Sequence, residues 1–285
     1  MGYATHFLRL LHYILGDPSK LPPFPEAWGA APPSLPKELE DIVPNGIGSI
    51  LYSDVGFKFY EKCTAGTSRP GWVVKEHQVT ELVWDILPES SATDNADAQT
   101  YKWEWISKAQ LPAIADKLKE SMTSDLLDRK ANGTVYRADP TSPGLLDWLN
   151  VRGPWLAYVK PQHEEPLGIR TTSPDGVETI VLICAHNEHI GARLLITCVQ
   201  NLTPDHLPSL LAQLDTVANR AGRKEGWIWG LGLESELVSA WKGLKGRNVV
   251  SGVRAEQVGH LLGVAWYGDE SDQGEFAEWQ MWDWC

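Results

Sequence analysis

Apolar residues near the start of the chain recur at helical spacing. Between residues 5 and 15 they lie three and four positions apart, as on one face of an amphipathic helix: Phe7, Leu8, Leu10, Leu11, Ile14 and Leu15. Gly16-Asp17-Pro18 follows directly, and proline cannot continue a helix. The pattern therefore predicts a helix over residues 5–15.

Beyond this helix the pattern predicts a connection, a strand and a second helix. Six prolines between residues 21 and 36 prevent regular backbone hydrogen bonding, so this stretch is expected to be an extended connection or a proline-rich ligand. Residues 47–52 form a short β-like run, and residues 57–62 continue as a helix. Another extended segment is expected to begin at Gly71-Trp72.

The polar run over residues 88–100 has no apolar period and predicts a domain boundary. After it, Ser107 is placed to cap a long helix, and Thr203 to open a second helix that reaches residue 221. Strands are expected at residues 179–185, 193–201, 226–232 and 260–267, with a helix near residues 234–244. We therefore expect a mixed α/β (α+β) fold, with an N-terminal part over 1–87, a linker over 88–100 and a C-terminal α/β domain over 101–285.

Charge and composition narrow the classes of partner. The 285 residues carry a net charge of -12, and their basic residues are scattered, which argues against a nucleic-acid ligand and favours a cationic amine. No apolar run reaches the roughly 20 residues that span a bilayer, so we expect no membrane partner and a cytoplasmic location. The widely spaced cysteines contain no C-x-x-C pair and are expected to be reduced thiols, mostly in the core: Cys63, Cys184, Cys198 and Cys285.

The residues in front of the first predicted helix are candidates for binding an anion. Gly2-Tyr3-Ala4 are followed by Thr5, and small residues at a helix start allow a phosphate group to approach the free backbone N–H groups. A frayed terminus before an ordinary helix explains the same residues, because known phosphate loops carry several spaced glycines.

Several short blocks of residues follow one another along the chain: Gly2-Tyr3-Ala4, Leu51-Tyr52-Ser53-Asp54-Val55-Gly56, Phe59-Tyr60-Glu61-Lys62, Gly71-Trp72, Ala265-Trp266-Tyr267-Gly268 and Trp284-Cys285. The order of these blocks resembles the second half of the fold of the GNAT acyl-CoA-dependent N-acetyltransferases. Their residues are similar to those of the fungal lysine N-acetyltransferase branch of that superfamily. The resemblance implies a partial acetyltransferase core, with acetyl-CoA as co-substrate, a small amine such as lysine as acceptor, and a role in lysine degradation.

The resemblance also assigns roles to particular residues. It implies that Gly2, Tyr3, Ala4 and Thr5 hold the CoA pyrophosphate, and that Tyr60 acts as the general acid that protonates the departing thiolate. A core aromatic on an amphipathic helix is the structural alternative for Tyr60. No metal is expected to take part.

Two departures from the family pattern matter. The strand that leads into the Gly-x-Ala turn is absent before Met1, which predicts an N-terminally truncated core. Residues 63–70 also separate Glu61-Lys62 from Gly71-Trp72 by more than the pattern has, which predicts an inserted loop that displaces Trp72 or bulges outward. The order of elements from Thr179 onward is itself reminiscent of half of such a core, so a degenerate second copy is conceivable.

The remaining candidates are better explained by structure. His186-Asn187-Glu188-His189 lacks the i, i+4 spacing of helical metal ligands. Trp279, Trp282 and Trp284 are expected to pack as an aromatic cluster, with Glu275, Glu278 and Asp283 beside them. Two functions therefore stay open: an acetyl-CoA-dependent N-acetyltransferase, and a non-catalytic interaction protein or relic derived from one.

Overall fold

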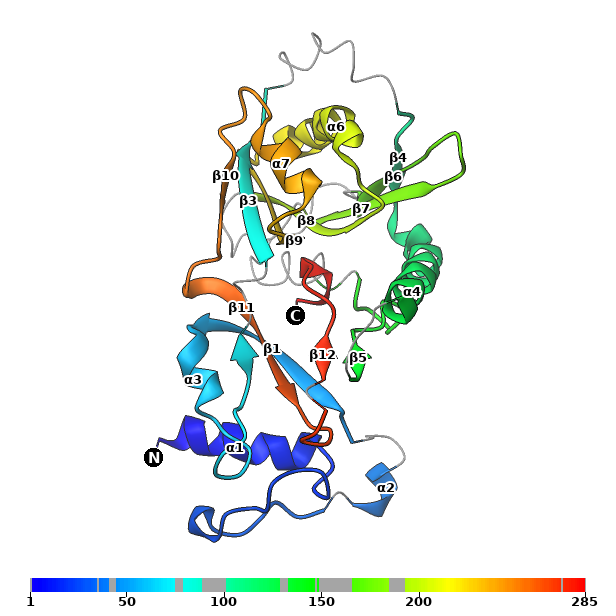
Figure 1. The fold of residues 1–285 in the computed structure, drawn as a ribbon. Helices are drawn as coiled ribbons and strands as arrows, with labels where there is room; N and C mark the ends of the chain where they lie inside the picture. The colour runs from blue at the N-terminus through cyan, green and yellow to red at the C-terminus, as the bar shows by residue number, and fades with distance from the viewer. Residues whose placement is uncertain are drawn as a thin grey trace. The chain divides into compact units, whose positions relative to one another are not determined.

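A computed structural model describes residues 2–34, 36–40, 45–74, 79–88, 101–128, 133–146, 148, 166–184, 193–272 and 274–284. The chain folds into two compact units. Unit 1 comprises Met1–His77, Arg129–Arg137 and Arg254–Ala277, and unit 2 comprises Gln78–Asp128, Ala138–Val253 and Glu278–Cys285. Neither unit is continuous in sequence, because each contains strands from both halves of the chain (Figure 1).

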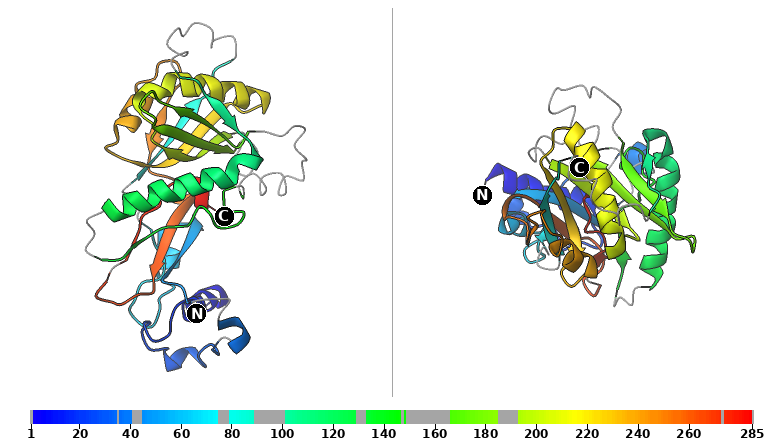
Figure 2. Two further views of the ribbon diagram at one scale, coloured as in Figure 1. Left: turned by 90° about the vertical axis from the view of Figure 1, so that its right-hand side faces the viewer. Right: turned by 90° about the horizontal axis from the view of Figure 1, so that it is seen from above.

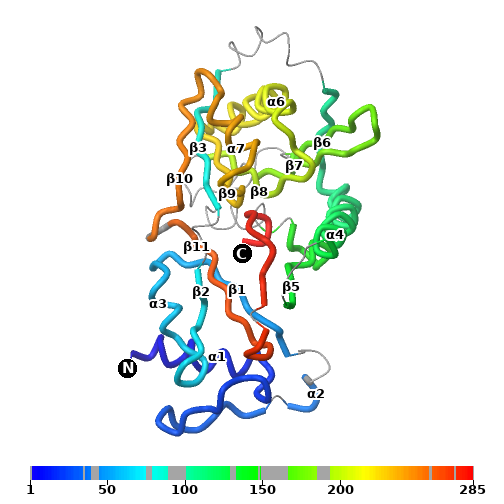
Figure 3. The backbone as a smooth tube through the Cα atoms, in the orientation of Figure 1, coloured from blue at the N-terminus to red at the C-terminus, as the bar shows by residue number. Residues whose placement is uncertain are grey.

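Unit 1 contains a three-stranded antiparallel sheet and the first helices of the chain. Its strand order is β1-β11-β2, with β1 at Gly48–Val55, β11 at Gln257–Trp266 and β2 at Val73–Val74. The helices are α1 (Tyr3–Leu15), α2 (Lys37–Glu40) and α3 (Phe57–Glu61), and β5 (Val135–Tyr136) pairs in parallel with β12 (Glu275–Phe276). The tube in Figure 3 shows β1 and β11 side by side, although more than half of the chain separates them in sequence.

The core of unit 1 forms where these distant segments meet. Gly48 pairs with Trp266 and Leu51 with Gly263, so apolar side chains of β11 lie over α1 and the loop after α3. The buried residues of this core are Leu21, Cys63, Ala65, Trp72, Ala265 and Tyr267. Burial of this apolar surface, which joins α1 to a strand near the C-terminus, is the main stabilising term of the unit.

Unit 2 is built on a seven-stranded sheet in the order β10-β3-β9-β8-β7-β6-β4. The strands are β3 (Val79–Asp85), β4 (Glu104–Ile106), β6 (Gly168–Thr172), β7 (Glu178–Cys184), β8 (Arg193–Gln200), β9 (Glu225–Gly232) and β10 (Val250–Gly252). Neighbours are antiparallel except β8 and β9, which run parallel and are joined by the helical crossover α6 (Leu207–Arg220). A parallel pair needs such a crossover, whereas the antiparallel strands β6 and β7 are joined by the short segment between Thr172 and Glu178.

Helices cover both faces of this sheet (Figure 2). On β7, Val181 and Ile183 point to the face covered by α6 and α7 (Glu236–Lys242), while Ile180 and Leu182 point to the face covered by α4 (Leu111–Asp128). This alternation is the period of two that a strand imposes on its side chains, and it explains why β7 is apolar throughout.

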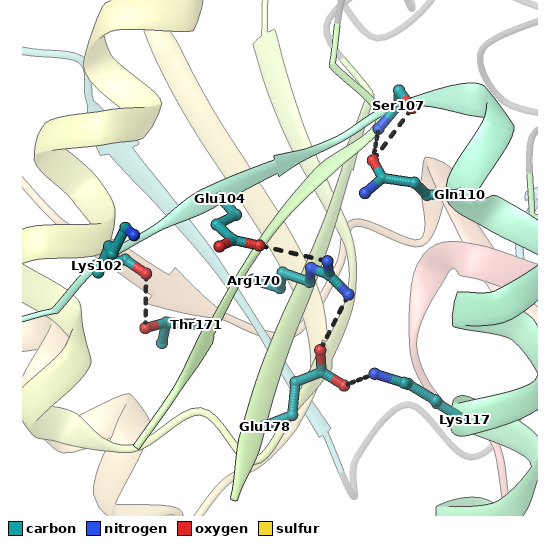
Figure 4. Close-up of polar contacts among 8 residues, drawn as sticks. All are labelled: Lys102, Glu104, Ser107, Gln110, Lys117, Arg170, Thr171 and Glu178. Carbon is teal, nitrogen blue, oxygen red and sulfur yellow. Dashed lines mark hydrogen bonds and ion pairs between the residues drawn. The ribbon is translucent and has the colours of Figure 1, made fainter. Parts of the chain in front are cut away.

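A chain of ion pairs lies across the β4 edge of the sheet (Figure 4). Arg170 on β6 contacts Glu104 on β4 and Glu178 on β7, with N–O distances of 3.3 Å to each, and Lys117 of α4 contacts the other oxygen of Glu178 at 2.5 Å. These side chains are partly exposed, so each pair contributes little to stability. They connect side chains of β4, β6 and β7 with one another and with α4.

The predicted mixed α/β class is confirmed. The structure contains the expected helices and strands at or near their predicted positions, and Ser107 and Thr203 precede helices as expected. Each of the two also forms a capping box, with Gln110 and His206 respectively. The division of the chain differs from the expected ranges 1–87 and 101–285, because β11 pairs with β1 and β3 pairs with β9. The expected linker lies outside the described residues from residue 89 onward.

Candidate functional site

The N-terminus of α1 presents backbone donors without a side-chain cap. Gly2 is the N-cap residue and has an extended conformation (φ -74°, ψ 150°). No side chain caps the helix start with a hydrogen bond, and the first turn contains no acidic residue. The first helical bond runs from the His6 N–H to the Gly2 carbonyl at 3.1 Å, which leaves the N–H groups of Tyr3, Ala4 and Thr5 without a partner inside the helix. Such a terminus attracts a negative charge.

Gly2, Tyr3 and Ala4 are exposed, and Tyr3 keeps 96% of its surface accessible. A Cβ atom at Gly2 would meet no atom within 4 Å, so no residue that the structure describes crowds Gly2. The four residues predicted to hold a pyrophosphate therefore share one exposed helix start, and their role as a binding site stays a prediction.

Tyr60 lies on α3 and is partly buried. Gly56 precedes α3 with φ of 87°, a left-handed conformation that favours glycine and turns the chain sharply from β1 into the helix. The Tyr60 ring packs edge-on against Phe59 and Trp72, with ring centroids 5.0 and 6.2 Å apart, at the border of the unit 1 core. The ring is thus held in place by aromatic contacts.

The hydroxyl of Tyr60 makes no hydrogen bond to any residue that the structure describes. Burial raises the pKa of this phenol, and the neighbouring Cys63 and Asp54 raise it further. A phenol with a raised pKa stays protonated at neutral pH, so Tyr60 can donate a proton but is a poor base. Tyr60 thus has the aromatic packing of the structural alternative and the available hydroxyl that a general acid needs. Its catalytic role stays a prediction.

The structure brings Tyr60 together with the middle of α1 and not with its first turn. Leu8 and Leu11 of α1 pack in the same core cluster as Tyr60, and Nη2 of Arg9 donates to the carbonyl of Lys62, just after α3, at 3.3 Å. No hydrogen bond, ion pair or ring contact links Tyr60 to residues 2–5 within the described part of unit 1. The two halves of the predicted site are thus neighbours through α1 and do not touch.

The loop over residues 63–70 leaves Trp72 buried. The Ala65 N–H donates to the Arg69 carbonyl at 3.0 Å, so the loop closes on itself, and the Trp72 N–H returns to the Tyr60 carbonyl at 3.3 Å. A Cβ at Gly71 would lie 2.3 Å from the Tyr60 carbonyl oxygen, which explains the glycine at this return. Of the two outcomes expected for this loop, displacement of Trp72 from the core does not occur, because its side chain is 3% exposed.

A buried histidine that the sequence did not single out lies at the centre of unit 1. His12 is fully buried, stacks on Trp72 with ring centroids 4.3 Å apart, and places Nε2 2.7 Å from the Cys63 carbonyl and Nδ1 3.1 Å from the Tyr267 hydroxyl. Burial lowers the pKa of this imidazole, more strongly than the carbonyl contact raises it. His12 is therefore neutral at pH 7.

These contacts fix the direction of a hydrogen-bond chain. The Cys63 carbonyl can only accept, so His12 Nε2 carries the proton and Nδ1 accepts from the Tyr267 hydroxyl. Tyr267 in turn accepts from Ser49, 2.8 Å away, and the Trp72 indole N–H donates to the Ser49 hydroxyl at 2.7 Å. Every member is satisfied, which is typical of a buried network that specifies a unique core. The spacing of apolar residues does not reveal this network, because His12 lies within the apolar stripe of α1 and only the tertiary structure shows its partners.

The other candidates have structural roles or fall outside the described residues. Residues 185–192, which include His186 and His189, are not described, and the described residues contain no group of three or more metal-ligating side chains. Trp282 and Trp284 are buried as expected of a packing cluster, and Glu278 is buried as well, with its carboxylate accepting the N–H groups of Trp279 and Gln280. In the part of the chain that is described, no helix has the length and apolar character needed to span a membrane.

Three of the cysteines are buried free thiols, as expected: Cys63, Cys184 and Cys198. Burial raises the pKa of the Cys63 thiol, while the nearby Arg9 lowers it less. A buried thiol of raised pKa is a poor nucleophile, so Cys63 does not suit covalent catalysis.

Comparisons with known proteins do not show a family for this chain. No protein-family model matches the chain, and no curated protein matches it. Among solved structures, the chain is similar to a GCN5-related N-acetyltransferase from Anabaena variabilis, with 14% sequence identity and a TM-score of 0.36. The similarity covers 80% of this chain and 47% of that chain, so this chain spans about half the length of that protein. The neighbour belongs to the class that the sequence resembles, and at this TM-score the likeness carries no argument about fold or function.

Proposed function

We propose that this chain is an acetyl-CoA-dependent N-acetyltransferase that acts on lysine or a similar small amine. The observation that carries the proposal lies in unit 1. There α1 has an uncapped start free of acidic residues, and α3 carries a phenol with an available hydroxyl beside the core cluster that α1 also lines. The first suits the pyrophosphate of a CoA thioester, and the second suits the protonation of its departing sulfur.

The residues present fit such a co-substrate in charge as well. α1 contains no acidic residue and carries the cationic side chain of Arg9, so it is locally basic in a chain whose net charge is -12. Backbone N–H groups at its start need no additional cation to bind a phosphate oxygen, because the helix dipole adds to their partial charges. The acidic chain as a whole favours a cationic acceptor over an anionic one.

The transfer needs one proton donor and no covalent enzyme intermediate. The neutral amine nitrogen attacks the thioester carbonyl carbon, the C–S bond breaks, and the thiolate takes the proton of the Tyr60 hydroxyl. The proton lost by the amine nitrogen returns through solvent to the Tyr60 phenolate, which restores the starting state. Backbone N–H groups are the donors expected to stabilise the oxyanion.

Two variants test the two halves of the site separately. Tyr60→Phe should lower the rate of CoA release about 10²- to 10⁴-fold with little change in acetyl-CoA affinity, because it removes only the proton donor. Tyr13→Phe is the matched control, since the Tyr13 hydroxyl donates to the Pro22 carbonyl at 2.8 Å and is already used. Ala4→Asp should weaken acetyl-CoA binding about fivefold, because it places a negative charge in the first turn of α1.

Ala113→Asp, in the exposed first turn of α4, controls for the added charge. The measurements are calorimetric titration with acetyl-CoA and thiol detection of released CoA, with lysine as acceptor. Unchanged affinity in Ala4→Asp would remove α1 from the site, and an unchanged rate in Tyr60→Phe would remove Tyr60 from the chemistry. Binding of acetyl-CoA without turnover of any amine would favour the non-catalytic alternative.

A further inference from the structure

The proline-rich stretch between α1 and α2 contains the same spacing twice (Figure 1). An apolar residue, a proline, any residue, a second apolar residue and a proline follow one another at Leu21-Pro22-Pro23-Phe24-Pro25 and again at Pro32-Pro33-Ser34-Leu35-Pro36. A polyproline II helix has three residues per turn, so two prolines three positions apart lie on one side of it. By sequence each copy is a connection or a ligand, and the structure treats the two copies differently.

The first copy is packed against the aromatic side chains of unit 1. The Tyr13 hydroxyl of α1 donates to the Pro22 carbonyl at 2.8 Å. The Phe24 ring lies edge-on to Tyr13 and to Trp28, with centroids 5.0 and 5.7 Å apart. Pro25 has φ of -69° and ψ of 125°, close to polyproline II values. The chain thus holds this copy with aromatic residues, as the aromatic-lined grooves of recognition domains hold such segments.

The second copy has no such cover. Pro33, Ser34 and Pro36 are exposed, and Pro32 is partly buried. In the part of unit 1 that the structure describes, no hydrogen bond joins residues 30–34 to another residue. Proline fixes φ near -65°, and a residue before a proline is restricted to extended or polyproline II backbone. The second copy therefore favours a polyproline II conformation and keeps its carbonyl groups available to a partner.

Both flanks of the second copy are anchored in unit 1. Before it, the 3-10 helix Glu26–Trp28 is held by the guanidinium of Arg9, which lies over the Trp28 ring at 4.8 Å from its centroid. After it, the Pro36 carbonyl accepts the N–H of Leu39 at 2.8 Å, in the first turn of α2. A short segment that is held at both ends loses little conformational freedom when it binds a partner.

We propose that Pro32, Pro33 and Pro36 are the contact residues of a docking segment for a protein domain of the SH3 type. No aromatic residue accompanies these prolines between residues 29 and 51, so the proline spacing itself is the feature that the partner reads. Pro33 and Pro36 fill neighbouring pockets of an aromatic-lined groove. The proposal is independent of the proposed function, because it involves neither the start of α1 nor Tyr60.

The test titrates a panel of purified SH3 domains with the full-length chain by biolayer interferometry. At least one domain should bind. The double variant Pro33→Ala, Pro36→Ala should weaken that binding about tenfold or more, because it removes the apolar rings that the groove buries. The matched control is Pro18→Ala with Pro23→Ala, which removes two exposed prolines outside the second copy and should bind as the wild type does.

A synthetic peptide of residues 29–38 gives an answer that does not depend on the folding of a variant. This peptide should displace the full-length chain from the domain, and a peptide with alanine at positions 33 and 36 should not. Chemical-shift changes in the bound domain should map to its aromatic groove. Absence of binding across the panel, equal binding by the two double variants, displacement by the alanine peptide, or shifts outside the groove would overturn the proposal.

Discussion

The ion pair between Asp215 and Arg247 is a buried, bidentate charge contact in unit 2. Nη1 and Nη2 of Arg247 lie 2.9 and 2.6 Å from the two Asp215 carboxylate oxygens, and the two side chains are 8% and 3% exposed. Asp215 also accepts the N–H of Leu87 at 3.1 Å, and Arg247 reaches the carbonyl of Asp85 at 3.3 Å. The pair thereby connects α6, the end of β3 and the segment before β10.

Asp215→Ala should destabilise unit 2 by about 3–5 kcal/mol, the cost of leaving a buried guanidinium without its counter-charge. The Leu87 N–H loses its acceptor in the same variant, which places the loss toward the upper end of that range. Arg247→Met leaves the carboxylate buried and should cost a similar amount. Removing both partners with Asp215→Leu and Arg247→Met should cost about 2–3 kcal/mol less than the sum of the single losses, because no charge is then stranded.

Urea unfolding followed by tryptophan fluorescence measures these losses, since Trp84 and Trp241 lie in the same core as α6. The control is Lys119→Met, which breaks the exposed pair between Lys119 and Asp139 and should cost less than about 1 kcal/mol. High salt should leave the Asp215→Ala loss unchanged, because a buried pair is hardly screened. A loss below about 1 kcal/mol in Asp215→Ala, or strict additivity in the double variant, would refute the reasoning.

Three further predictions concern packing, titration and capping. Gly226→Ala places a Cβ 2.1 Å from the Trp84 ring and should cost about 1–3 kcal/mol in urea unfolding, whereas Gly252→Ala, with open space around it, should cost under about 1 kcal/mol. Burial holds the pKa of His12 below its ordinary value of 6.5, so the unfolded chain binds a proton at this residue more readily than the folded chain does. The stability that neutral His12 contributes to the folded state is therefore present above pH 6.5 and is lost as the pH falls through the folded pKa. The melting temperature should therefore fall between pH 7.5 and pH 5 by more than it does in His12→Gln, which keeps one donor and one acceptor without titrating; equal falls would contradict the assignment. Thr203→Ala removes a capping box and should cost about 1 kcal/mol in thermal unfolding, and no loss would show that the Pro204 turn suffices.

The helices and strands could be predicted from the sequence because apolar spacing and capping residues involve only neighbours along the chain. The apolar stripe of α1 and the apolar run of β7 report which face is buried, and capping residues such as Ser107 mark where a helix begins. The strands at Val79–Asp85 and Gly168–Thr172 were missed, since short strands beside polar stretches have little period to detect. Alternation alone also could not say which strand pairs with which.

The candidate site shows the same limit. The exposed start of α1 follows from the position of Gly2 before an apolar stripe, and the availability of the Tyr60 hydroxyl does not follow from any pattern. The His12 network joins residues of α1, β1 and the chain beyond β11, and so it exists only once the tertiary pairing is made. Its single signal in sequence is a histidine inside an apolar helical stripe, which is equally compatible with a frayed or exposed position.

The pairing of β3 and β11 explains why the domain ranges expected from sequence differ from the units observed. β3 precedes most of unit 2 in sequence and inserts between β9 and β10, while β11 follows most of unit 2 and inserts between β1 and β2. Each unit thus receives a central strand from across the expected boundary. Residues 1–87 alone would lack the strand that carries half of the β1 ladder and the Tyr267 hydroxyl that His12 requires.

The reciprocal dependence extends to unit 2. Residues 101–285 alone would lack β3, whose Leu82 and Trp84 are buried in the core that α6 and α7 cover, and would expose the facing edge of β9 along Glu225–Gly232. Both sheets form through contacts between residues that are far apart in sequence. Each central strand therefore pairs with its neighbours only at a cost in loop-closure entropy. The unit of folding is therefore the whole chain, and a catalytic role for Tyr60 in unit 1 depends on residues that follow nearly all of unit 2.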